Sequence, residues 1–361
     1  MKEPEEEREK RIGRRKGKKM EGERGREMKT IKASIIGFGS IGQGVARVLL
    51  DKKDYLNKEG IDIKVVAVTD SKGSMINENG LDLEKCLAMK AEKKTVAEKI
   101  GMTGLDVITQ LDHDLVIEVT PTNIITGGDG LANMRAAFEH KRDVVTSNKG
   151  PLTLKFRELT KLAEENGCYF KYEATVGGAM PIINLMRDGM AGNEIESVKG
   201  IFNGTCNYIL TRMYEEKSNY SEILTEAVDL GIAETDPTYD VEGIDTAGKV
   251  VILANAVFGM DKTIADVDRT GITKITYESL EMSIKSGKTI KLIGEIKKDG
   301  RLSVAPRLVP IGHPLSVSGT LNVASIQTDL AGEITVTGKG AGSVETASSI
   351  LSDIISIYRE N

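Results

Sequence analysis

The sequence has no tryptophan and only three cysteines in 361 residues. These cysteines, Cys86, Cys168 and Cys206, are widely spaced and odd in number. That pattern excludes a disulfide framework or a cysteine zinc cluster and is typical of a reducing compartment. No apolar run approaches the roughly 18 residues that a membrane helix needs, and the N-terminus has no apolar signal-peptide core. We therefore expect a cytoplasmic protein with no membrane partner.

Beyond its N-terminal segment the chain has fewer basic than acidic side chains. The formal net charge is −5, to which residues 1–29 contribute +4 and the remainder −9. An acidic body argues against a broad nucleic-acid interface, because phosphate binding requires clustered Lys and Arg. We expect a small-molecule substrate and no nucleic-acid partner.

The first 29 residues are almost free of apolar side chains. Such a segment cannot bury enough surface to offset its ordering entropy, so we interpret residues 1–29 as a disordered charged extension. A nucleic-acid-binding arm is an alternative, although the mixed charge signs favour a solvated tail. Translation from Met28 is a third interpretation, because the predicted fold begins directly after it.

From residue 31 the sequence alternates β-branched runs with helical patterns. Strands are predicted at residues 31–38, 63–69, 115–120 and 143–147. Helices are predicted at residues 41–52 and 130–140. Alternation of this kind implies parallel βαβ units. We therefore expect an α/β fold in which a Rossmann-type, doubly wound parallel sheet forms a dinucleotide-binding domain over residues 30–150.

The pattern changes after Gly150. Strands of a second sheet are predicted at residues 170–174, 198–202, 289–296 and 302–309. Helices are predicted between them at residues 181–190, 221–230 and 246–258. These elements indicate an α+β domain for substrate binding and dimerisation over residues 151–337. The last predicted helix, residues 343–358, is expected to pack back on the first domain, which residues 338–361 would complete.

A glycine-rich turn follows the first predicted strand and opens the first helix. Gly37, Gly39 and Gly42 have the GxGxxG spacing, with Ser40 and Ile41 between the last two. The first glycine permits a tight turn, the second lets the backbone approach a pyrophosphate, and the third allows close helix–strand packing. The helix N-terminus then faces the phosphates. This context favours a binding site for a nicotinamide dinucleotide over a merely tight turn.

The end of the second predicted strand leaves the choice between NAD and NADP open. Asp70 lies there, and an acid at this place binds a ribose 2′-hydroxyl and repels a 2′-phosphate, which favours NAD. Ser71 and Lys72 follow directly, and their side chains suit a 2′-phosphate. The expected cofactor is therefore NADP or NAD.

Two lysines stand in segments where a substrate would meet the cofactor. Lys149 follows the strand predicted at residues 143–147, and ligands of open parallel sheets bind beyond such carboxyl ends. A surface lysine in a turn is an equally good interpretation of this motif alone. Lys249 ends a second segment, residues 234–249, which contains five carboxylates. Clustered carboxylates would suit a substrate that carries an ammonium group.

Asp245 precedes Lys249 by one helical turn at the start of a predicted helix. A plain i,i+4 ion pair would be worth roughly a few tenths of a kcal/mol and needs no function. The density of polar groups beside an apolar helix favours instead a lysine that Asp245 holds at a cleft, where it faces an alcohol or carbonyl.

Two glycine turns in the second half leave alternatives open. The segment 172–181 ends in a glycine turn whose exposed carbonyls, together with Glu173, could surround a monovalent cation. A plain strand-to-helix connection is nearly as good an interpretation. The segment 200–208 resembles a strand, a tight turn and a helix start. Cys206 in that segment suggests a thiol nucleophile, but the histidines show no arrangement that would activate it, which favours packing.

These motifs together resemble homoserine dehydrogenase from residue 31 to the C-terminus. The resemblance rests on GFGSIGQG at 37–44, SNKGPL at 147–152, YEATVGGAMPI at 172–182, GIFNGTCNYI at 200–209, and above all AETDPTYDVEGIDTAGK at 233–249. GKGAGSVETAS at 338–348 is similar to the closing segment of the family. The resemblance implies reversible interconversion of L-homoserine and L-aspartate 4-semialdehyde with NAD(P), in threonine, methionine and isoleucine biosynthesis. It also implies a homodimer.

The resemblance further implies a role for each matching residue. At the reacting oxygen it implies the catalytic residues Lys249 and Lys149, with Asp245 to orient them. For substrate binding it implies Glu234, Asp240, Gly204 and Thr205. Near the nicotinamide end and the closing segment it implies Thr120, Lys149, Gly342 and Glu345 as cofactor residues. For a sodium or potassium site it implies Glu173, Val176, Gly178 and Met180.

Two other functions are consistent with parts of the sequence. A semialdehyde dehydrogenase would use Cys206 as its nucleophile and would need phosphate. A non-catalytic NAD(P)-sensing protein would have kept the dinucleotide-binding domain without the reaction. Such a sensor has no use for Lys149, Lys249, Glu234 and Asp245, which argues against it.

Overall fold

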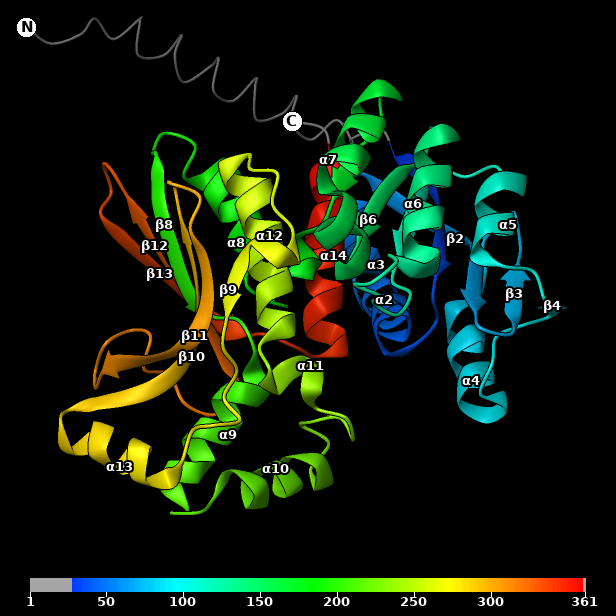
Figure 1. Ribbon diagram of the computed structural model, residues 1–361. Coiled ribbons are helices and arrows are strands. Elements are labelled where there is room, and N and C mark those ends of the chain that lie inside the picture. Colours follow the sequence, from blue (N-terminus) through cyan, green and yellow to red (C-terminus); the bar gives the residue numbers. More distant parts are fainter. Residues whose placement is uncertain (1–27, 360–361) are drawn as a thin grey trace, which may run out of the picture.

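The first part of the chain folds around a seven-stranded sheet. The computed structural model describes residues 28–359 and is shown in Figure 1. The strand order is β4-β3-β2-β1-β5-β6-β7. The strands are β1 (Lys29–Ile36), β2 (Ile61–Asp70), β3 (Gly73–Ile76), β4 (Lys99–Ile100), β5 (Leu115–Glu118), β6 (Asp143–Thr146) and β7 (Phe170–Lys171). Five of them are parallel, as expected, whereas β3 and β4 add an antiparallel edge.

Helices cover both faces of this sheet, which makes it doubly wound. They are α2 (Ser40–Asp51), α3 (Lys53–Lys58), α4 (Leu83–Lys93), α5 (Gly104–Gln110), α6 (Gly128–Glu139) and α7 (Lys149–Glu165). Ile35 belongs to a core shared with α2, and Ile36 belongs to a core shared with α5 and α6. Neighbouring strand residues point to opposite faces, so a strand buried on both sides is apolar throughout.

The C-terminal helix returns to this first sheet. Helix α14 (Ser343–Tyr358) packs against α2, and its Ile350 and Ile354 lie in the same core as β1. A Cβ on Gly44 of α2 would lie 2.4 Å from the backbone oxygen of Ser343, so the two helices approach closely. Helix α14 therefore packs on the first sheet.

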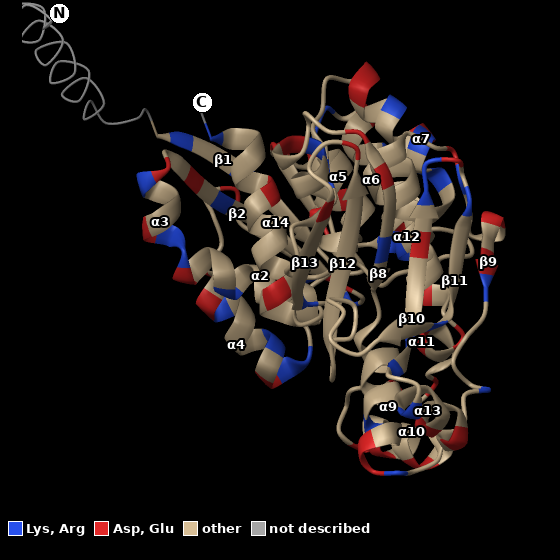
Figure 2. Ribbon diagram, turned by 90° about the vertical axis from the view of Figure 1, so that its left-hand side faces the viewer, with Lys and Arg blue, Asp and Glu red and all other residues tan. Residues whose placement is uncertain are grey.

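A second sheet of six strands follows, in the order β13-β12-β8-β10-β11-β9. The strands are β8 (Ile195–Ile201), β9 (Val267–Arg269), β10 (Lys288–Lys297), β11 (Leu302–Pro310), β12 (Leu321–Thr328) and β13 (Glu333–Lys339). Neighbours run antiparallel, except that β9 lies parallel to β11. Figure 2 shows the outer face of this sheet turned to the viewer, with no described helix in front of it.

The helices of the second part pack behind this sheet and at one end of it (Figure 1). They are α8 (Ile182–Asn184), α9 (Gly204–Glu215), α10 (Tyr220–Asp229), α11 (Thr238–Val241), α12 (Ile244–Phe258) and α13 (Tyr277–Lys285). A π-helical turn, Leu185–Gly189, continues α8, and 3-10 turns lie at Glu173–Thr175 and Ile264–Asp266. Within residues 28–359, no helix combines the length and the apolar character that a membrane span requires.

Two predicted boundaries are wrong. Phe170–Lys171 forms β7 of the first sheet, parallel to β6, rather than a strand of the second sheet. Helix α7 supplies the crossover that a parallel neighbour of β6 needs, so the first sheet extends beyond Gly150. Lys29 lies in β1, where its N–H bonds to the oxygen of Gly60 at 2.9 Å, so it is not part of a disordered extension. The predicted disorder of residues 1–27 lies outside the described residues.

Candidate active site

The glycine turn joins β1 to α2 in the geometry that dinucleotide binding requires. Gly37 has a φ of +101°, and a Cβ there would lie 2.7 Å from a backbone oxygen of the segment after β5. A Cβ on Gly42 would lie 2.1 Å from the oxygen of Gly37, so both positions require glycine. Gly39 is exposed with nothing within 4 Å of its Cβ position, and Ser40 and Ile41 open α2. The turn leaves space for a pyrophosphate in front of this helix N-terminus.

The closing segment of the chain lies beside this turn. Gly342 precedes α14 with a φ of +131°, and the neighbouring Ser343 approaches Gly44 of α2. Glu345 lies in the first turn of α14, where it pairs with Lys339 at 3.0 Å. Both predicted cofactor residues of this segment therefore lie near the first turns of α2.

The Asp70 carboxylate is occupied by partners inside the protein. Its Oδ1 accepts hydrogen bonds from the Lys72 N–H at 2.9 Å and the Thr95 hydroxyl at 3.0 Å. Its Oδ2 accepts from Lys90 Nζ at 2.6 Å and the Val96 N–H at 3.0 Å. Burial raises the pKa of Asp70, but these bonds, led by that of Lys90, lower it overall. A carboxylate has about four acceptor positions, and none is left here for a ribose hydroxyl.

The ends of β5 and β6 carry the next predicted site residues. Thr120 follows β5, and its hydroxyl accepts a hydrogen bond from the Asn148 amide at 3.1 Å. Asn148 caps α7, because its Oδ1 accepts the Gly150 N–H at 3.1 Å. Lys149 is the first residue of that helix. The cap therefore holds the backbone from which the Lys149 side chain extends.

Lys149 and Lys249 meet at one carboxylate. Lys249 Nζ lies 2.6 Å from Asp245 Oδ2, and Lys149 Nζ lies 3.5 Å from Asp245 Oδ1. Lys249 also donates to the backbone oxygen of Phe202 at 2.5 Å. Asp245 and Lys249 are buried on α12, whereas 22% of the Lys149 side chain remains exposed. The structure thus brings together two lysines that lie 100 positions apart in the sequence.

A second carboxylate adjoins this cluster through Asn203. The Asn203 amide donates to Asp240 Oδ1 at 2.6 Å and to Asp245 Oδ2 at 3.0 Å. Burial alone raises the pKa of Asp245, but the ammonium groups of Lys249 and Lys149 outweigh it and hold that pKa far below its usual range. Burial, followed by the charge of Asp245, raises the pKa of Asp240. A cationic group of a ligand would relieve the charge repulsion at Asp240.

The other predicted substrate residues lie around the start of α9. Gly204 is the first residue of this helix, and Asn203 caps it by accepting the Cys206 N–H at 2.8 Å. The Thr205 hydroxyl donates to the backbone oxygen of Ile232 at 3.1 Å. Glu234 follows that carbonyl by two residues and is exposed. The structure therefore joins Gly204 and Thr205 to the cluster and leaves Glu234 on the surface segment before α11.

The predicted cation residues form a turn before α8. The Glu173 carboxylate accepts the backbone N–H groups of Ile183 at 2.9 Å and Asn184 at 2.6 Å. Burial raises the pKa of Glu173 to about 7. The carbonyl of Gly178 accepts a hydrogen bond from Ser349 at 2.6 Å. A carbonyl has two lone pairs, so this turn still has oxygens for a cation, and the buried acid suits one as its counter-charge.

The remaining cation residues, Val176 and Met180, are buried in the same turn. The Met180 carbonyl already accepts the Ile182 N–H at 2.8 Å. Among residues 28–359 no group of three or more His, Cys, Asp or Glu side chains could hold a metal ion. A site at this turn would therefore depend on backbone carbonyls, and it stays a prediction.

Cys206 is packed inside the protein. Its exposed fraction is 0%, and its thiol donates to the backbone oxygen of Asp240 at 3.2 Å. Burial, followed by the charges of Asp240 and Asp245, raises the pKa of this thiol well above its usual value. A nucleophilic cysteine needs a thiolate, so the geometry favours the packing interpretation.

Sequence reasoning missed three polar residues of this region, namely Asn148, Asn203 and Glu118. Both asparagines stand at a strand-to-helix junction, where Asn is a typical N-cap, and this signal could have singled them out. Glu118 is an acid inside an otherwise apolar strand, Leu115–Glu118, and is fully buried. A charged residue in such a run is itself a signal of function.

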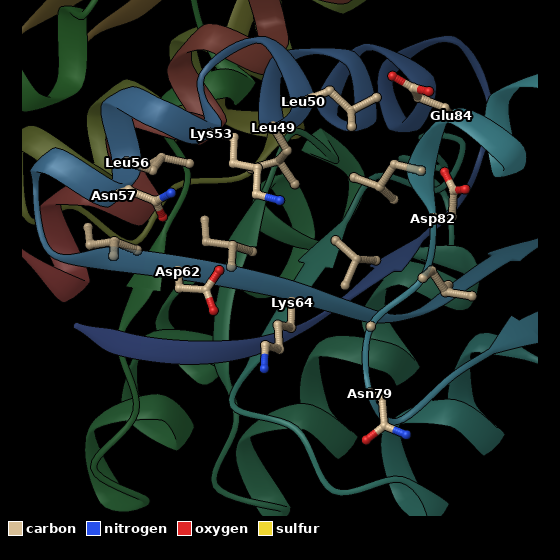
Figure 3. A pocket seen from close by; sticks show the side chains of 16 residues that line it. Leu49, Leu50, Lys53, Leu56, Asn57, Asp62, Lys64, Asn79, Asp82 and Glu84 are labelled. Atoms are coloured by element: carbon tan, nitrogen blue, oxygen red, sulfur yellow. The ribbon is translucent and has the colours of Figure 1, made fainter.

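A separate hollow lies away from this cluster. It has a volume of about 360 Å³ and opens between α2, α3, β2 and the segment that leads into α4 (Figure 3). Leu49, Leu56 and Leu83 form part of its apolar lining, with Asp62 and Lys64 at its side. None of the predicted site residues lines it, so it is not the cofactor cleft.

The dinucleotide turn after β1 and the lysine–carboxylate cluster define the class of the protein. It is an oxidoreductase that uses NAD(P). The profile of the homoserine dehydrogenase NAD-binding domain matches residues 37–173, and that of homoserine dehydrogenase matches residues 181–355. The chain therefore belongs to the homoserine dehydrogenase family.

Individual relatives agree with this assignment. A homoserine dehydrogenase of Methanocaldococcus jannaschii is 56% identical over 328 residues, which cover 90% of this chain and 97% of the relative. An NAD(+)-dependent homoserine dehydrogenase of Pseudomonas canavaninivorans is 38% identical over 343 residues, covering 92% and 97%. The solved structure of a hyperthermophilic archaeal homoserine dehydrogenase in complex with NADPH has a TM-score of 0.80 at 27% identity and covers 91% of this chain and 97% of its own.

Proposed function

We propose that Lys149 and Lys249 act at the reacting oxygen as this enzyme interconverts L-homoserine and L-aspartate 4-semialdehyde. The observation that carries the proposal is the Asp245 carboxylate between their two ammonium groups, 3.5 and 2.6 Å away. One lysine starts α7 beside the first sheet, and the other belongs to α12 of the second part. Ligands of open parallel sheets bind beyond the carboxyl ends of the strands, where this group lies.

The lysines provide charge and a proton while NAD(P)H, when bound at the glycine turn, supplies the hydride. Negative charge develops on the aldehyde oxygen as its carbon is reduced. A lysine ammonium stabilises that charge and donates the proton, directly or through water. Lysine suits this role better than arginine, which stays protonated in proteins. Asp245 keeps both ammonium groups directed at one point.

The carboxylates beside the lysines would hold the amino-acid part of the substrate. Asp240 lies next to Asp245, and both face the same amide of Asn203. We assign the substrate ammonium to Asp240, with Glu234 closing the site from the surface. Gly204 and Thr205, at the start of α9, would contact the substrate through the backbone and the hydroxyl.

The adenosine end of the cofactor is assigned to the segment Asp70–Lys72. Because Asp70 has no acceptor position left and Lys90 offsets its charge, this segment does not exclude a 2′-phosphate. Ser71 and Lys72 would contact that phosphate. We infer that the enzyme accepts NADP, and that Thr120, Lys149, Gly342 and Glu345 lie along the rest of the cofactor. A preference for NAD in binding measurements would contradict the role given to Ser71 and Lys72.

We further propose a monovalent cation, sodium or potassium, at Glu173, Val176, Gly178 and Met180. The buried Glu173 acid and the glycine turn support it.

A homodimer is proposed as well, in which the uncovered outer face of the second sheet is the contact surface (Figure 2). Leu308 and Ile311, each 57% exposed, lie at the end of β11 and would add apolar area to such a contact. A mass measurement in solution tests the dimer.

The pathway and the compartment follow from the reaction. An enzyme that makes homoserine would serve threonine, methionine and isoleucine biosynthesis, with its substrate as a small molecule in the cytoplasm. Free cysteines at all three positions suit that reducing compartment. Neither a nucleic acid nor a membrane is proposed as a partner.

A spectrophotometric assay tests the proposal directly. The absorbance at about 340 nm should rise with homoserine and either NAD or NADP, because this band belongs to the reduced cofactor. The reverse assay with the semialdehyde should need no phosphate. Cys206→Ala should stay active. Dependence on phosphate together with an inactive Cys206→Ala variant would favour the semialdehyde dehydrogenase, and cofactor binding without any turnover would favour a sensor.

A further inference from the structure

Glu118 is a buried acid at the cofactor edge of the first sheet. It ends β5, level with Ile36 of β1 and Thr146 of β6, and its exposed fraction is 0%. Its Oε1 accepts hydrogen bonds from the Thr120 hydroxyl and, at 3.2 Å, from the Thr120 N–H. Its Oε2 makes no hydrogen bond to any of residues 28–359. The proposed roles of the lysines and carboxylates do not use this residue.

The surroundings of Glu118 are polar but carry no positive charge. Burial raises its pKa, and the groups that act against burial are the neutral side chains of Thr120, Asn148 and Asn133. Gly130, in the first turn of α6, comes so close that a Cβ there would lie 3.2 Å from Oε2. The first turn of α6 therefore packs against the carboxyl group. No Lys, Arg or His side chain of the described part of the chain forms an ion pair with Glu118, and none is among the leading influences on its pKa.

A buried charge of this kind is costly unless a counter-charge is present. Dipoles reduce the cost, but a cation within reach would offset much more of it. Without a counter-charge the raised pKa keeps this acid protonated, so a ligand that places a positive charge beside it would favour the ionised carboxylate.

The position of Glu118 indicates which part of a ligand would supply it. The pyrophosphate belongs at the glycine turn after β1, and the reacting group belongs at Lys149 and Lys249. The residues at the ends of β5 and β6, Thr120 and Asn148, lie between these two places and would hold the hydride-donating end of the cofactor. Glu118 accepts hydrogen bonds from Thr120, whose hydroxyl in turn accepts one from Asn148, so its carboxylate would lie close to the hydride-transferring end of the cofactor.

The two redox forms of the cofactor differ in charge at that end. The nicotinamide ring is a cation when oxidised and is neutral when reduced. We propose that Glu118 is the counter-charge of the oxidised nicotinamide ring, so that its carboxylate strengthens binding of the oxidised cofactor relative to the reduced one. With the cofactor bound, the same carboxylate of Glu118 would favour reduction of the aldehyde, because it would stabilise the positive charge that the hydride donor gains. The inference uses the proposed lysine site only to place the ring.

Cofactor binding without substrate tests the inference. Glu118→Gln keeps the size of the side chain and removes its charge. Three ligands are titrated calorimetrically, all from either the NAD or the NADP series. They are the oxidised cofactor, the reduced cofactor and the ADP-ribose compound that lacks the nicotinamide ring. For the variant we expect the Kd of the oxidised form to rise about tenfold, in line with one charge interaction at protein-like dielectric. The other two Kd values should change by less than about twofold.

A matched control removes an exposed acid from the C-terminal end of α6, the helix whose first turn lies beside Glu118. Glu139→Gln at the exposed end of α6 should leave all three Kd values unchanged. Equal weakening of all three ligands by Glu118→Gln would show a purely structural role, and unchanged binding would show no role. Either result overturns the inference.

Two further measurements keep the test decisive if Glu118→Gln does not fold. Glu118→Asp retains the charge, so it should keep the preference for the oxidised form, and loss of that preference overturns the inference. In the unmodified protein the oxidised cofactor should bind more tightly than the ADP-ribose compound, and equal binding overturns it too. If the cofactor affinities are as expected but the protein does not turn over homoserine, the proposed function is contradicted and the inference about Glu118 is not.

Discussion

At the scale of single residues, the reaction depends on two ammonium groups that share the Asp245 carboxylate. Replacing Lys249 or Lys149 with Ala removes a proton donor and a positive charge from the reacting oxygen. General acid–base catalysis contributes roughly 10²- to 10⁴-fold, so we expect kcat to fall by about that factor in each variant. Asp245 keeps the other lysine and Asn203 as partners, so thermal stability should change much less.

Steady-state kinetics and thermal denaturation of the same samples separate these effects. Lys161→Ala is the control, because it removes an exposed lysine from an i,i+4 pair with Glu165 on α7. Its kcat should equal that of the unmodified enzyme. Near-normal turnover in either Lys249→Ala or Lys149→Ala would refute the assignment of that lysine.

A second residue-scale prediction concerns acid stability and His113. This histidine is buried between the Ser34 hydroxyl and the Leu111 carbonyl, at 3.1 and 3.0 Å. Burial, followed by the charge of Arg142, lowers its pKa to about 4, from 6.5. The unfolded chain therefore takes up a proton before the folded protein does. Folding stability should be full above about pH 6.5 and should fall as the pH drops towards 4.

The measurement compares unfolding free energies of the unmodified protein and His113→Asn between these pH values. The variant cannot take up this proton, so the difference between the two proteins should shrink in acid by on the order of 3 kcal/mol. His140→Asn, at the exposed end of α6, should follow the unmodified protein. A difference that does not vary with pH would contradict the role of His113.

At the scale of elements, two glycines of the turn after β1 have different roles. Gly37 is needed for the fold, whereas we expect Gly39 to be needed only for cofactor binding. Gly37→Ala places a Cβ 2.7 Å from a backbone oxygen at a φ of +101°, so we expect lower thermal stability as well as lost cofactor binding. Gly39→Ala meets no atom within 4 Å, so the fold should keep its stability. Its methyl group would occupy space that the pyrophosphate needs.

Differential scanning calorimetry and cofactor titration distinguish the two variants. The expected result is a lowered Tm only for Gly37→Ala and a raised Kd for both. Unchanged cofactor affinity in Gly39→Ala would mean that the pyrophosphate does not approach this turn.

The elements that the sequence predicts well are those with strong local patterns. The last helix has the predicted bounds, Ser343–Tyr358, because its apolar stripe and the preceding glycines are visible in the chain. β4 and β7 have only two residues each, which is too short for alternation to show, so one was missed and the other was assigned to the wrong sheet. β13 has no buried residue, and only Ile334 and Val336 alternate with polar residues in it, which is too short an apolar pattern to mark a strand clearly.

In the candidate site, too, the sequence predicts contacts between residues that are close in the chain but not contacts between distant elements. The glycine turn and the Asp245–Lys249 pair lie within a few residues, so their geometry follows from strand, turn and helix rules. The approach of Lys149 to Asp245 depends on how α7 packs against α12, which no local pattern contains. The occupied state of the Asp70 carboxylate likewise depends on Lys90 and Thr95, which come from α4 and the segment after it.

At the scale of the whole molecule, the two halves meet where α7 packs on α12 and at a second junction around Asp353 of α14. The Glu173 N–H donates to Asp353 Oδ2 of α14 at 2.9 Å. The Asn184 amide, at the end of α8, donates to Asp353 Oδ1 at 2.9 Å. Helix α14 packs on the first sheet and α8 begins the second part, so these bonds connect both halves at the turn assigned to the cation. Whatever stabilises this turn should therefore stabilise the whole protein.

This junction makes the proposed cation measurable through global stability. A ligand that binds only the folded state stabilises it by about 2.7 kcal/mol at 100 times its Kd. Sodium or potassium chloride should raise Tm by a few degrees over choline chloride at equal ionic strength, which controls for screening. Glu173→Gln should abolish that difference, whereas Glu164→Gln on exposed α7 surface should preserve it. Equal Tm values in all three salts would show that no stabilising cation binds at the turn, and the Asp353 bonds would then hold this junction without one.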